Sequence, residues 1–319
     1  MTQAGNGRLT HIEWPTLIVC LLCYLGFGIS TFFATSLGVL ASGILLTLAL
    51  TLYSSFNHEV LHGHPFENEH ANTALVFPAL GILIPYYRFR DTHLEHHHDP
   101  VLTDPYDDPE TNYIAPDVWA GWGPLRQSLY RFNNTLLGRM TVGPVIGLIS
   151  FYHADMVAIV RGNRKIVTGY LFHLAGLVPV ALWLGYAATM PLWVFAIAVY
   201  ASHSILKIRT FLEHRAHEKA RCRSVVIEDQ GLLSYLFLKN NLHAVHHACP
   251  TVPWYQLEDH YAQRRSTVLT RNGGYFYASY QDIFRQYFLH AKDPVPHQTT
   301  SDISSTPAPG VDVTQRYSP

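Results

Sequence analysis

The sequence is short of charged residues. Asp, Glu, Lys and Arg make up only 14% of its 319 residues, whereas an average soluble domain is about 25% charged. The formal net charge is −1, so no excess of basic residues supports binding to nucleic acid. The 4 cysteines form neither the framework of a small disulfide-bonded domain nor the cluster that would hold an iron–sulfur centre. This composition favours a membrane protein.

Long apolar runs are what the sequence has instead. Four of them approach the length of about 20 residues that crosses a bilayer core. They cover residues 16–34, 37–56, 166–190 and 191–208. The links within each pair are very short, so each pair is predicted to form a helical hairpin. A shorter run at 74–87 contains two prolines and is predicted to be re-entrant or interfacial, and residues 142–152 are predicted to be a further interfacial piece.

Basic residues predict the orientation of these segments. The tips of the two hairpins contain no Lys or Arg, and basic residues lie near the other ends of the spans. These residues are Arg88, Arg90, Arg161, Arg164, Lys165, Lys207, Arg209 and Arg215. Because Lys and Arg accumulate on the cytoplasmic side of a membrane, we expect both termini and the region between the hairpins to be cytoplasmic. The chain is then a multi-pass protein, expected in a cell inner membrane.

The predicted fold is all-α, with two transmembrane hairpins (about four spans) and a cytoplasmic helical cap. The expected divisions are an N-terminal tail (1–15), the first hairpin (16–57), a cytoplasmic region (58–165), the second hairpin (166–210), a second cytoplasmic region (211–292) and a tail (293–319). The tail is rich in Pro, Ser and Thr and has little apolar content, so it is predicted to be disordered.

Histidine is abundant, with 20 residues against 22 Lys and Arg together, and many of these histidines are clustered. Three boxes, HEVLH, HLEHH and HAVHH, all lie in the regions predicted to be cytoplasmic. Their members are His58, His62, His93, His96, His97, His243, His246 and His247. Residues spaced i, i+3 and i+4 share one face of a helix, so each box can direct two or three imidazoles to one centre. Together they exceed the four ligands of a zinc ion and suit two metal ions of higher coordination number, such as iron.

The first box, taken alone, allows a different interpretation. H-E-x-x-H on a helix is typical of zinc metalloproteases, in which Glu59 would be the general base. An intramembrane zinc protease explains one box and leaves the other two without a purpose, so it is a distant alternative. A membrane metal-binding or transport protein is a non-enzymatic alternative, which predicts metal uptake without consumption of O2.

With three boxes in this order and paired spans between them, the chain resembles the integral-membrane fatty acid desaturase and hydroxylase superfamily. The resemblance rests on HEVLH, HLEHH and the distant HAVHH, and it covers roughly residues 16–260. It implies a non-haem di-iron centre, held mainly by histidine, that uses O2 and external electrons to attack an unactivated C–H bond. The superfamily often supplies a further histidine between the second and third boxes, and FLEHRAH offers His214 first and His217 second.

Residues beside the boxes are candidates for orienting the imidazoles through hydrogen bonds. They are Glu59, Glu95, Glu213 and Asn241. Asn240 and Asn241 precede the third box directly, where helix capping is the expected role and a contact to a metal-bound water the alternative. The acidic run at 99–110 is predicted to be a proline-punctuated loop, with contact to an amine-bearing substrate or an electron donor as the alternative. His64 is expected not to be a ligand.

Desaturation of an acyl chain in a lipid or lipid-like substrate is the activity that the resemblance implies first. Hydroxylation or ketolation of a lipid, a lipid head group or a small amino-acid-like metabolite is the alternative, because small changes in substrate placement separate these outcomes. The sequence contains no haem, flavin or iron–sulfur motif, so an external ferredoxin-, rubredoxin- or cytochrome-type donor is implied. Arg215, Lys219, Arg221 and Arg223 are candidates for its docking, although ordinary positive-inside charge explains them equally.

Overall fold

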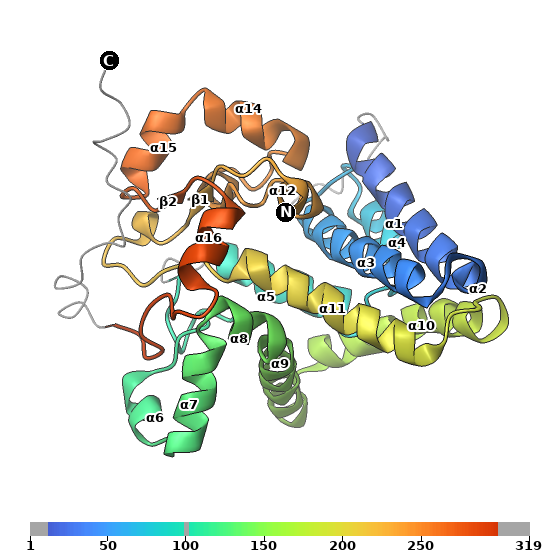
Figure 1. The fold of residues 1–319 in the computed structure, drawn as a ribbon, viewed down its shortest axis with the longest axis horizontal. Helices are drawn as coiled ribbons and strands as arrows, with labels where there is room; N and C mark the ends of the chain where they lie inside the picture. The colour runs from blue at the N-terminus through green and yellow to red at the C-terminus, as the bar shows by residue number, and fades with distance from the viewer. Residues whose placement is uncertain (1–11, 99–101, 299–319) are drawn as a thin grey trace.

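The computed structural model describes residues 12–98 and 102–298. Within this part of the chain, five helices are long and apolar enough to cross a membrane. They are α1 (Trp14–Phe32), α3 (Val39–Leu61), α9 (Gly143–Val160), α10 (Arg164–Tyr186) and α11 (Leu192–Thr210). Figure 1 shows the turns that join α1 to α3 and α10 to α11 close together at one end of the molecule, with a helical cap at the other.

The remaining elements are short and belong mainly to the cap and the connections. The helices are α2 (Ala34–Leu37), α4 (Glu69–Leu75), α5 (Tyr86–His98), α6 (Pro116–Ala120), α7 (Pro124–Asn133), α8 (Leu136–Thr141), α12 (Leu232–Leu236), α13 (His243–Ala248), α14 (Leu257–Ala262), α15 (Arg265–Arg271) and α16 (Tyr280–Tyr287), with 3-10 turns η1 (Ala220–Cys222) and η2 (Trp254–Gln256). Two short strands, β1 (Val226–Ile227) and β2 (Phe276–Tyr277), pair in parallel. The predicted all-α membrane fold is confirmed.

The first hairpin is tightly packed because small residues face each other across it. A Cβ placed on Gly26 of α1 would lie 2.8 Å from the Cβ of Ala49 on α3, and such small residues let membrane helices approach closely. Gly38 joins α2 to α3 with a φ of 82°, a conformation that glycine adopts without steric cost. α3 continues to Leu61, beyond the predicted end of the span at residue 56, and this extension places His58 in its last turn.

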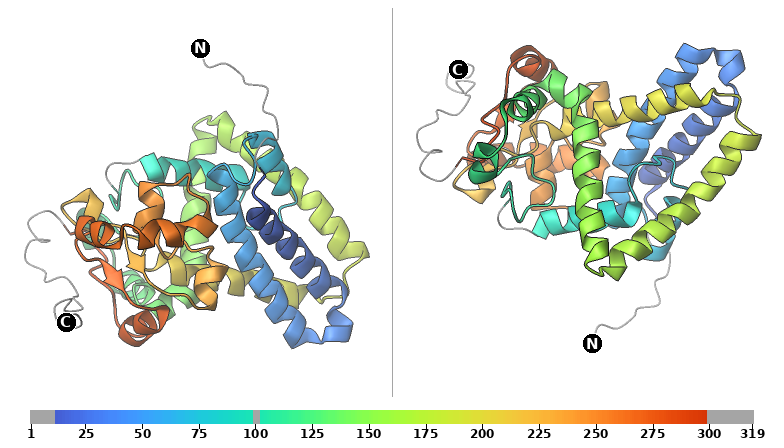
Figure 2. Two further views of the ribbon diagram at one scale, coloured as in Figure 1. Left: turned by 90° about the horizontal axis from the view of Figure 1, so that it is seen from above. Right: turned by 90° about the horizontal axis from the view of Figure 1, so that it is seen from below.

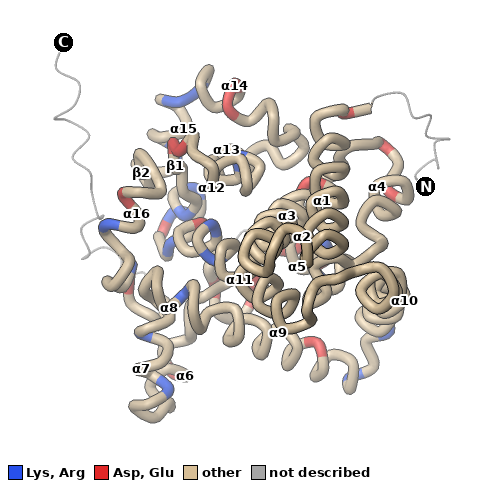
Figure 3. Tube along the Cα trace, turned by 45° about the vertical axis from the view of Figure 1, so that its right-hand side comes forward, with Lys and Arg blue, Asp and Glu red and all other residues tan. Residues whose placement is uncertain are grey.

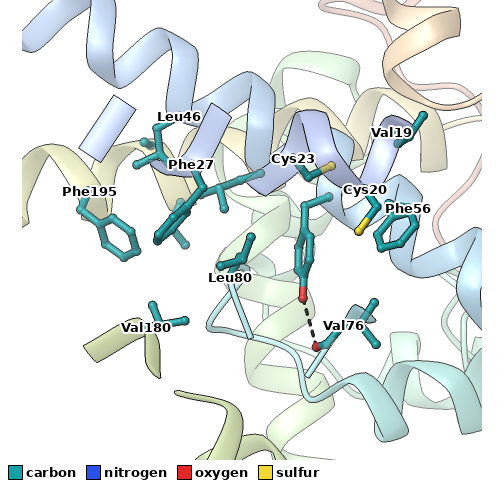
Figure 4. Packing of buried hydrophobic residues seen from close by; sticks show 14 of the residues in the cluster. Val19, Cys20, Cys23, Phe27, Leu46, Phe56, Val76, Leu80, Val180 and Phe195 are labelled. Carbon is teal, nitrogen blue, oxygen red and sulfur yellow. Dashed lines mark hydrogen bonds between the residues drawn. The ribbon is translucent and has the colours of Figure 1, made fainter. Parts of the chain in front are cut away.

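The apolar core lies between the two hairpins (Figure 4). It includes Val19, Cys20, Cys23 and Phe27 of α1, Leu46 and Phe56 of α3, Val76 and Leu80 of the segment that follows α4, Val180 of α10 and Phe195 of α11. Both cysteines near the N-terminus are therefore packing residues in this core. Burial of these side chains against one another fixes the relative position of the hairpins.

The segment predicted to be re-entrant is an irregular stretch between α4 and α5. Its backbone is hydrogen-bonded to the surrounding helices: Tyr53 of α3 donates to Pro78 O at 2.8 Å, and Ala79 N donates to Gly176 O of α10 at 3.1 Å. A Cβ on Gly176 would lie 2.1 Å from Phe77 O, so only glycine permits this approach. Irregular backbone is tolerated at such a position because protein groups satisfy it, and it leads directly into α5, which carries the second box.

Helix α9 is longer than the interfacial piece predicted at 142–152. Near its start, Gly147 adjoins the ammonium group of Lys207 in the last turn of α11. Farther along, Asp155 accepts hydrogen bonds from Arg88 of α5 and from Tyr170 near the start of α10. Both halves of α9 thus lie beside the cap ends of α10 and α11, and Figure 2 (right) shows α9 crossing between them. By length and composition α9 is also able to cross a membrane, so the described residues contain a fifth such helix where the sequence predicted about four spans.

The cap has its own core, which closes over the ends of α3 and α11. Its buried members include Leu136 of α8, Phe211 after α11, Ile227 of β1 and Ile283 of α16. Of the predicted tail, residues 293–298 pack on this cap, since Ile114 N donates to Val295 O at 3.2 Å. The prediction of disorder for the rest of the tail, and the predicted N-terminal tail up to residue 11, lie outside the described residues.

Candidate metal centre

The first histidine box stands at the end of the first hairpin. His58 lies in the last turn of α3 and His62 caps its C-terminus. Their ring centroids are 4.8 Å apart, as expected for an i, i+4 pair on one helix face. The Nε2 atoms of both rings are buried without a hydrogen-bond partner. A buried polar atom without a partner costs free energy, so these two nitrogens are oriented for a ligand.

The second box is carried by α5, which a buried ion pair holds against α9. Arg88, at the start of α5, donates to both carboxylate oxygens of Asp155 at 2.8–3.0 Å. Asp155 is only 2% exposed, and a bidentate arginine–carboxylate pair is geometrically specific. This pair fixes the start of the helix whose next turns present His93, His96 and His97.

The third box and His214 come from the cap. The loop after α11 pairs His214 with Ser224 in an antiparallel bridge, and this bridge turns the imidazole toward the box on α13. Ala244 N at the start of α13 donates to Val225 O at 2.8 Å. Ser224 and Val225, directly before β1, therefore position His214 and α13.

These elements bring all nine predicted ligands together in two groups, in each of which the candidate ligand atoms lie within 4.8 Å of one another. The five-histidine group is His58, His62, His93, His97 and His246, and the four-histidine group is His96, His214, His243 and His247. His217, the second choice for a ninth ligand, belongs to neither group. The second and third boxes are each divided between the two groups. In both boxes the middle histidine belongs to one group and the two outer histidines to the other.

Hydrogen bonds at Nδ1 fix which nitrogen of several rings faces inward. His96 Nδ1 lies 2.8 Å from Asp108 Oδ1, and His93 Nδ1 lies 3.0 Å from Glu110 Oε1. His243 Nδ1 lies 2.9 Å from Asn240 Oδ1. Because carboxylate and amide oxygens only accept, these Nδ1 atoms carry the proton. The Nε2 lone pairs are then directed into the centre.

The inward nitrogens of each group converge to within hydrogen-bonding distance of one another. His96 Nε2 and His243 Nε2 lie 2.9 Å and 3.0 Å from His214 Nε2. In the five-histidine group, His97 Nε2 lies 3.0 Å from His93 Nε2 and 3.2 Å from His246 Nε2. Converging lone pairs of neutral imidazoles repel one another, whereas a metal ion among them would be bound by all. The residues present therefore fit metal ions.

Burial also keeps most of these imidazoles neutral. Burial, reinforced by neighbouring histidines, holds the pKa of His214, His243, His246 and His247 well below the ordinary value. His96 differs: burial lowers its pKa, but the hydrogen bond to Asp108 and the nearby carboxylates outweigh that effect and raise the pKa to about 9. Neutral imidazole is the form that binds metal, so these four rings are ready for a cation at neutral pH, whereas His96 releases a proton when a cation binds.

Asp108 and Glu110 were not predicted from the sequence to contact the second box. They lie in the acidic run that was predicted to be a turn-rich loop, and the loop is present: Glu110 N donates to Asp108 Oδ1 at 2.9 Å. The same loop also delivers both carboxylates to the second box. The available signal was the DDPE string shortly after HLEHH, since a metal-bound histidine commonly donates its second N–H to a carboxylate.

The four residues predicted to orient the imidazoles differ in whether they lie beside a box histidine. Glu59 is buried, lies 3.7 Å from His58 Nδ1 and accepts a hydrogen bond from Trp254 N. Glu213 is paired with Arg209 at 2.9 Å and lies 3.8 Å from His243 Nδ1. Both carboxylates lie beside a box histidine, as the predicted role requires, but at distances longer than a hydrogen bond.

Glu95 and Asn241 do not fit the predicted role. Glu95 is exposed on α5, because the helix turns this position away from the face that carries the box histidines. Asn241 donates to Ile227 O and accepts from Ser234, so it supports the cap, and Asn240 contacts the box instead. Neither asparagine caps α13, whose N-cap is Leu242.

Three further histidines have protein partners away from the two groups. His64 Nδ1 lies 2.8 Å from Glu13 Oε1, in line with the expectation that it is not a ligand. His173 Nε2 donates to Ile82 O of the re-entrant segment, and His203 Nδ1 donates to Val199 O. These contacts give His173 and His203 structural roles within the spans.

Comparison with known proteins agrees with this geometry. A family model described as fatty acid desaturase matches residues 31–279, which include α3, the second hairpin, all three boxes and His214. No curated protein matches the chain.

Proposed function

Because the chain belongs to the fatty acid desaturase family, we propose that it is a membrane-bound di-iron oxidase that introduces a double bond into the acyl chain of a lipid. The chain is an oxidoreductase of the desaturase and hydroxylase type. The observation that supports the proposal most strongly is the convergence of nine imidazoles in two groups beside the ends of membrane helices.

We assign one iron ion to each histidine group. Four imidazoles would satisfy a zinc ion, but the five-histidine group exceeds the tetrahedral shell that zinc prefers, and imidazole suits iron well. An iron pair at this place would supply the reduction of O2 and the removal of hydrogen from an unactivated carbon. The chain holds the nitrogens in position: Asp108, Glu110 and Asn240 keep the proton on Nδ1 of their partners.

The proposed reaction balances with external electrons. In desaturation, two neighbouring carbons each lose a hydrogen atom and a C=C bond forms, while O2, two electrons and two protons complete the balance and yield two molecules of water. In hydroxylation, one C–H bond becomes C–OH and only one molecule of water forms. Both reactions need the same centre, so substrate placement decides between them.

The electron donor and the orientation are part of the proposal. We place the cap in the cytoplasm, in keeping with the basic residues on that side, and we expect a ferredoxin-, rubredoxin- or cytochrome-type donor to dock there. Of the basic candidates, Arg215 stacks on Tyr275 and Arg223 donates to His217 O, so both have structural contacts. Lys219 and Arg221 are exposed and are the better candidates for a charged partner.

The zinc-protease alternative is disfavoured by Glu59. A general base must reach a water molecule, but Glu59 is 4% exposed and its carboxylate accepts a hydrogen bond from Trp254 N. The other seven ligands of the two groups would also have no purpose in that reaction. Glu59 therefore fits a residue that supports the first box.

Lipid mass spectrometry tests the proposed reaction. We expect membranes of cells that express the chain to contain a lipid that has lost two hydrogen atoms relative to cells that express His246→Ala. A product that has instead gained one oxygen atom would contradict desaturation and establish hydroxylation. No O2-dependent change in any lipid or small metabolite, with a purified electron donor supplied to iron-loaded protein, would contradict the oxidase itself.

A further inference from the structure

Helices α6 and α7 carry an apolar surface that the metal centre does not explain. Leu125 of α7 is 85% exposed, the highest exposure among the leucines of this region. Leu129 and Phe132 follow at 41% and 39% exposed. The spacing i, i+4, i+7 puts the three side chains on one face of α7. Exposed apolar faces of this kind mark an interaction site when they are contiguous.

The opposite face of α7 is occupied by α6. Gln127 donates to Trp119 O at 3.0 Å, Arg131 lies over the ring of Trp119 at 5.5 Å, and Arg126 lies over Trp122 at 3.8 Å. At 100° per residue, Gln127 points about 165° away from the mean direction of the apolar face, Arg131 about 125° and Arg126 about 95°. The apolar face therefore points away from α6, and in Figure 1 α6 lies on the side of α7 remote from the hairpin tips.

Helix α9 continues this surface. Val145, Ile149, Tyr152, Met156 and Val160 are all exposed, from 38% for Tyr152 to 80% for Val160, and their spacing again places them on one helix face. α8 joins α7 to α9 and packs on α11, so the two apolar faces belong to one edge of the molecule, at the cap ends of the membrane helices (Figure 1).

The chemistry of the surface fits the boundary of a bilayer. Trp and Tyr are enriched at the level of the lipid head groups, and arginine can keep its charged end in water while its stem covers apolar surface. The combination of Trp119, Trp122 and Tyr130 with Arg126 and Arg131 around a Leu and Phe face is typical of helices that lie in this boundary. Figure 3 shows few acidic residues along α6 to α9, so little charge opposes such contact.

We propose that α7, together with α9, lies in the head-group layer of the same membrane that the hairpins cross, with Leu125, Leu129 and Phe132 inserted among the lipids. This contact anchors the cap to the bilayer surface. The anchored helix is also connected to the metal centre. α7 leads into α8, whose Arg139 donates a hydrogen bond to Asn112. Asn112 is close in sequence to Glu110, which contacts His93.

A spin label attached to cysteine at position 125 tests this proposal. The protein is reconstituted in nanodiscs of phosphatidylcholine and phosphatidylglycerol. Leu125→Cys and Leu129→Cys are made in a Cys249→Ser background, because Cys20, Cys23 and Cys222 are buried and only Cys249 is partly accessible. Collisions of the label with O2, which concentrates in lipid, are compared with collisions with a water-soluble nickel chelate.

Two reference positions calibrate the result. Leu171→Cys on α10 is 61% exposed on a spanning helix and reports lipid, and Ser266→Cys on the exposed side of α15 reports water. The proposal predicts that the labels at 125 and 129 favour O2 over the chelate, as the label at 171 does. A ratio equal to that at 266 would overturn it. Low collision rates with both reagents would also overturn it, since they indicate that a protein, such as a donor or a second copy of the chain, covers the face.

Discussion

The two histidine groups differ in what holds them. The five-histidine group takes His58 and His62 from the end of the membrane helix α3 and is supported mainly by helix packing. The four-histidine group draws three of its members from the cap and has hydrogen bonds at Nδ1 of His96, His214 and His243. The five-histidine group has one such contact, between His93 Nδ1 and Glu110, so it relies more on helix packing than the four-histidine group does, which predicts that the two groups respond differently to mutation.

The two groups also share their helices. On α5, His93 and His97 point to one group and His96 to the other, and on α13 His243 and His247 are separated from His246 in the same way. An i, i+4 pair stays together on the helix face, while the residue between lies about 60° or 100° around the helix axis. Damage to one helix should affect both groups, whereas damage to a single ring should affect one.

Removal of a single imidazole, from one group or from the other, should have the largest effect on metal content and activity and should distinguish the two groups. His243→Ala leaves three imidazoles in the smaller group, and we expect loss of the metal held there. His62→Ala leaves four in the larger group, so more of its metal should remain. Both variants should lose activity by more than the roughly 10- to 100-fold that loss of an outer partner costs.

Metal analysis and product formation measure these effects. His217→Ala is the matched control, because His217 lies outside both groups, and it should keep its metal and activity. Full activity in His243→Ala would show that the assignment of the four-histidine group is wrong.

Replacement of the carboxylates that contact the second box should have a smaller effect. Asp108→Asn and Glu110→Gln remove the negative charge beside His96 and His93. We expect metal affinity or activity to fall by roughly 10- to 100-fold for Asp108→Asn, and by less for Glu110→Gln. The reason is exposure: the side chain of Asp108 is 1% exposed, against 31% for Glu110, so water can replace part of the second contact. Metal titration of the two purified variants measures which of them binds metal more weakly. Equal affinities would contradict the expected difference between the buried and the partly exposed carboxylate.

The smallest effect is expected at Glu59. Glu59→Gln keeps an oxygen that can accept from Trp254 N, so we expect a reduction of only several-fold, about 1 kcal/mol, for a change to one buried hydrogen bond. Glu95→Gln is the matched control. Glu95 also lies within a histidine box but is exposed, so its replacement should have no effect. Complete loss of activity in Glu59→Gln with normal metal content would instead support a catalytic base. Turnover of the purified variants is the measurement.

Much of this centre was predictable from local sequence. Spans are visible as apolar runs because a bilayer demands length and hydrophobicity, and the box histidines are visible because i, i+3 and i+4 share a helix face. What local sequence could not give was the division of His96 from His93 and His97, since that depends on where α13 and His214 lie in space. Asp108 and Glu110 were missed for a related reason: a proline-rich acidic loop looks the same whether it points to water or to an imidazole. The length of α9 was missed because the apolar run predicted at 142–152 is followed by His153 and Asp155, and the buried pair of Asp155 with Arg88 appears only in three dimensions.

The central claim is that the two groups each bind an iron ion. Metal analysis of the purified, lipid-embedded protein tests it most directly, combined with the same measurement on His243→Ala. We expect two iron atoms per chain in the native protein and loss of the iron of the four-histidine group in the variant. One zinc ion per chain with no iron, unchanged in the variant, would contradict it.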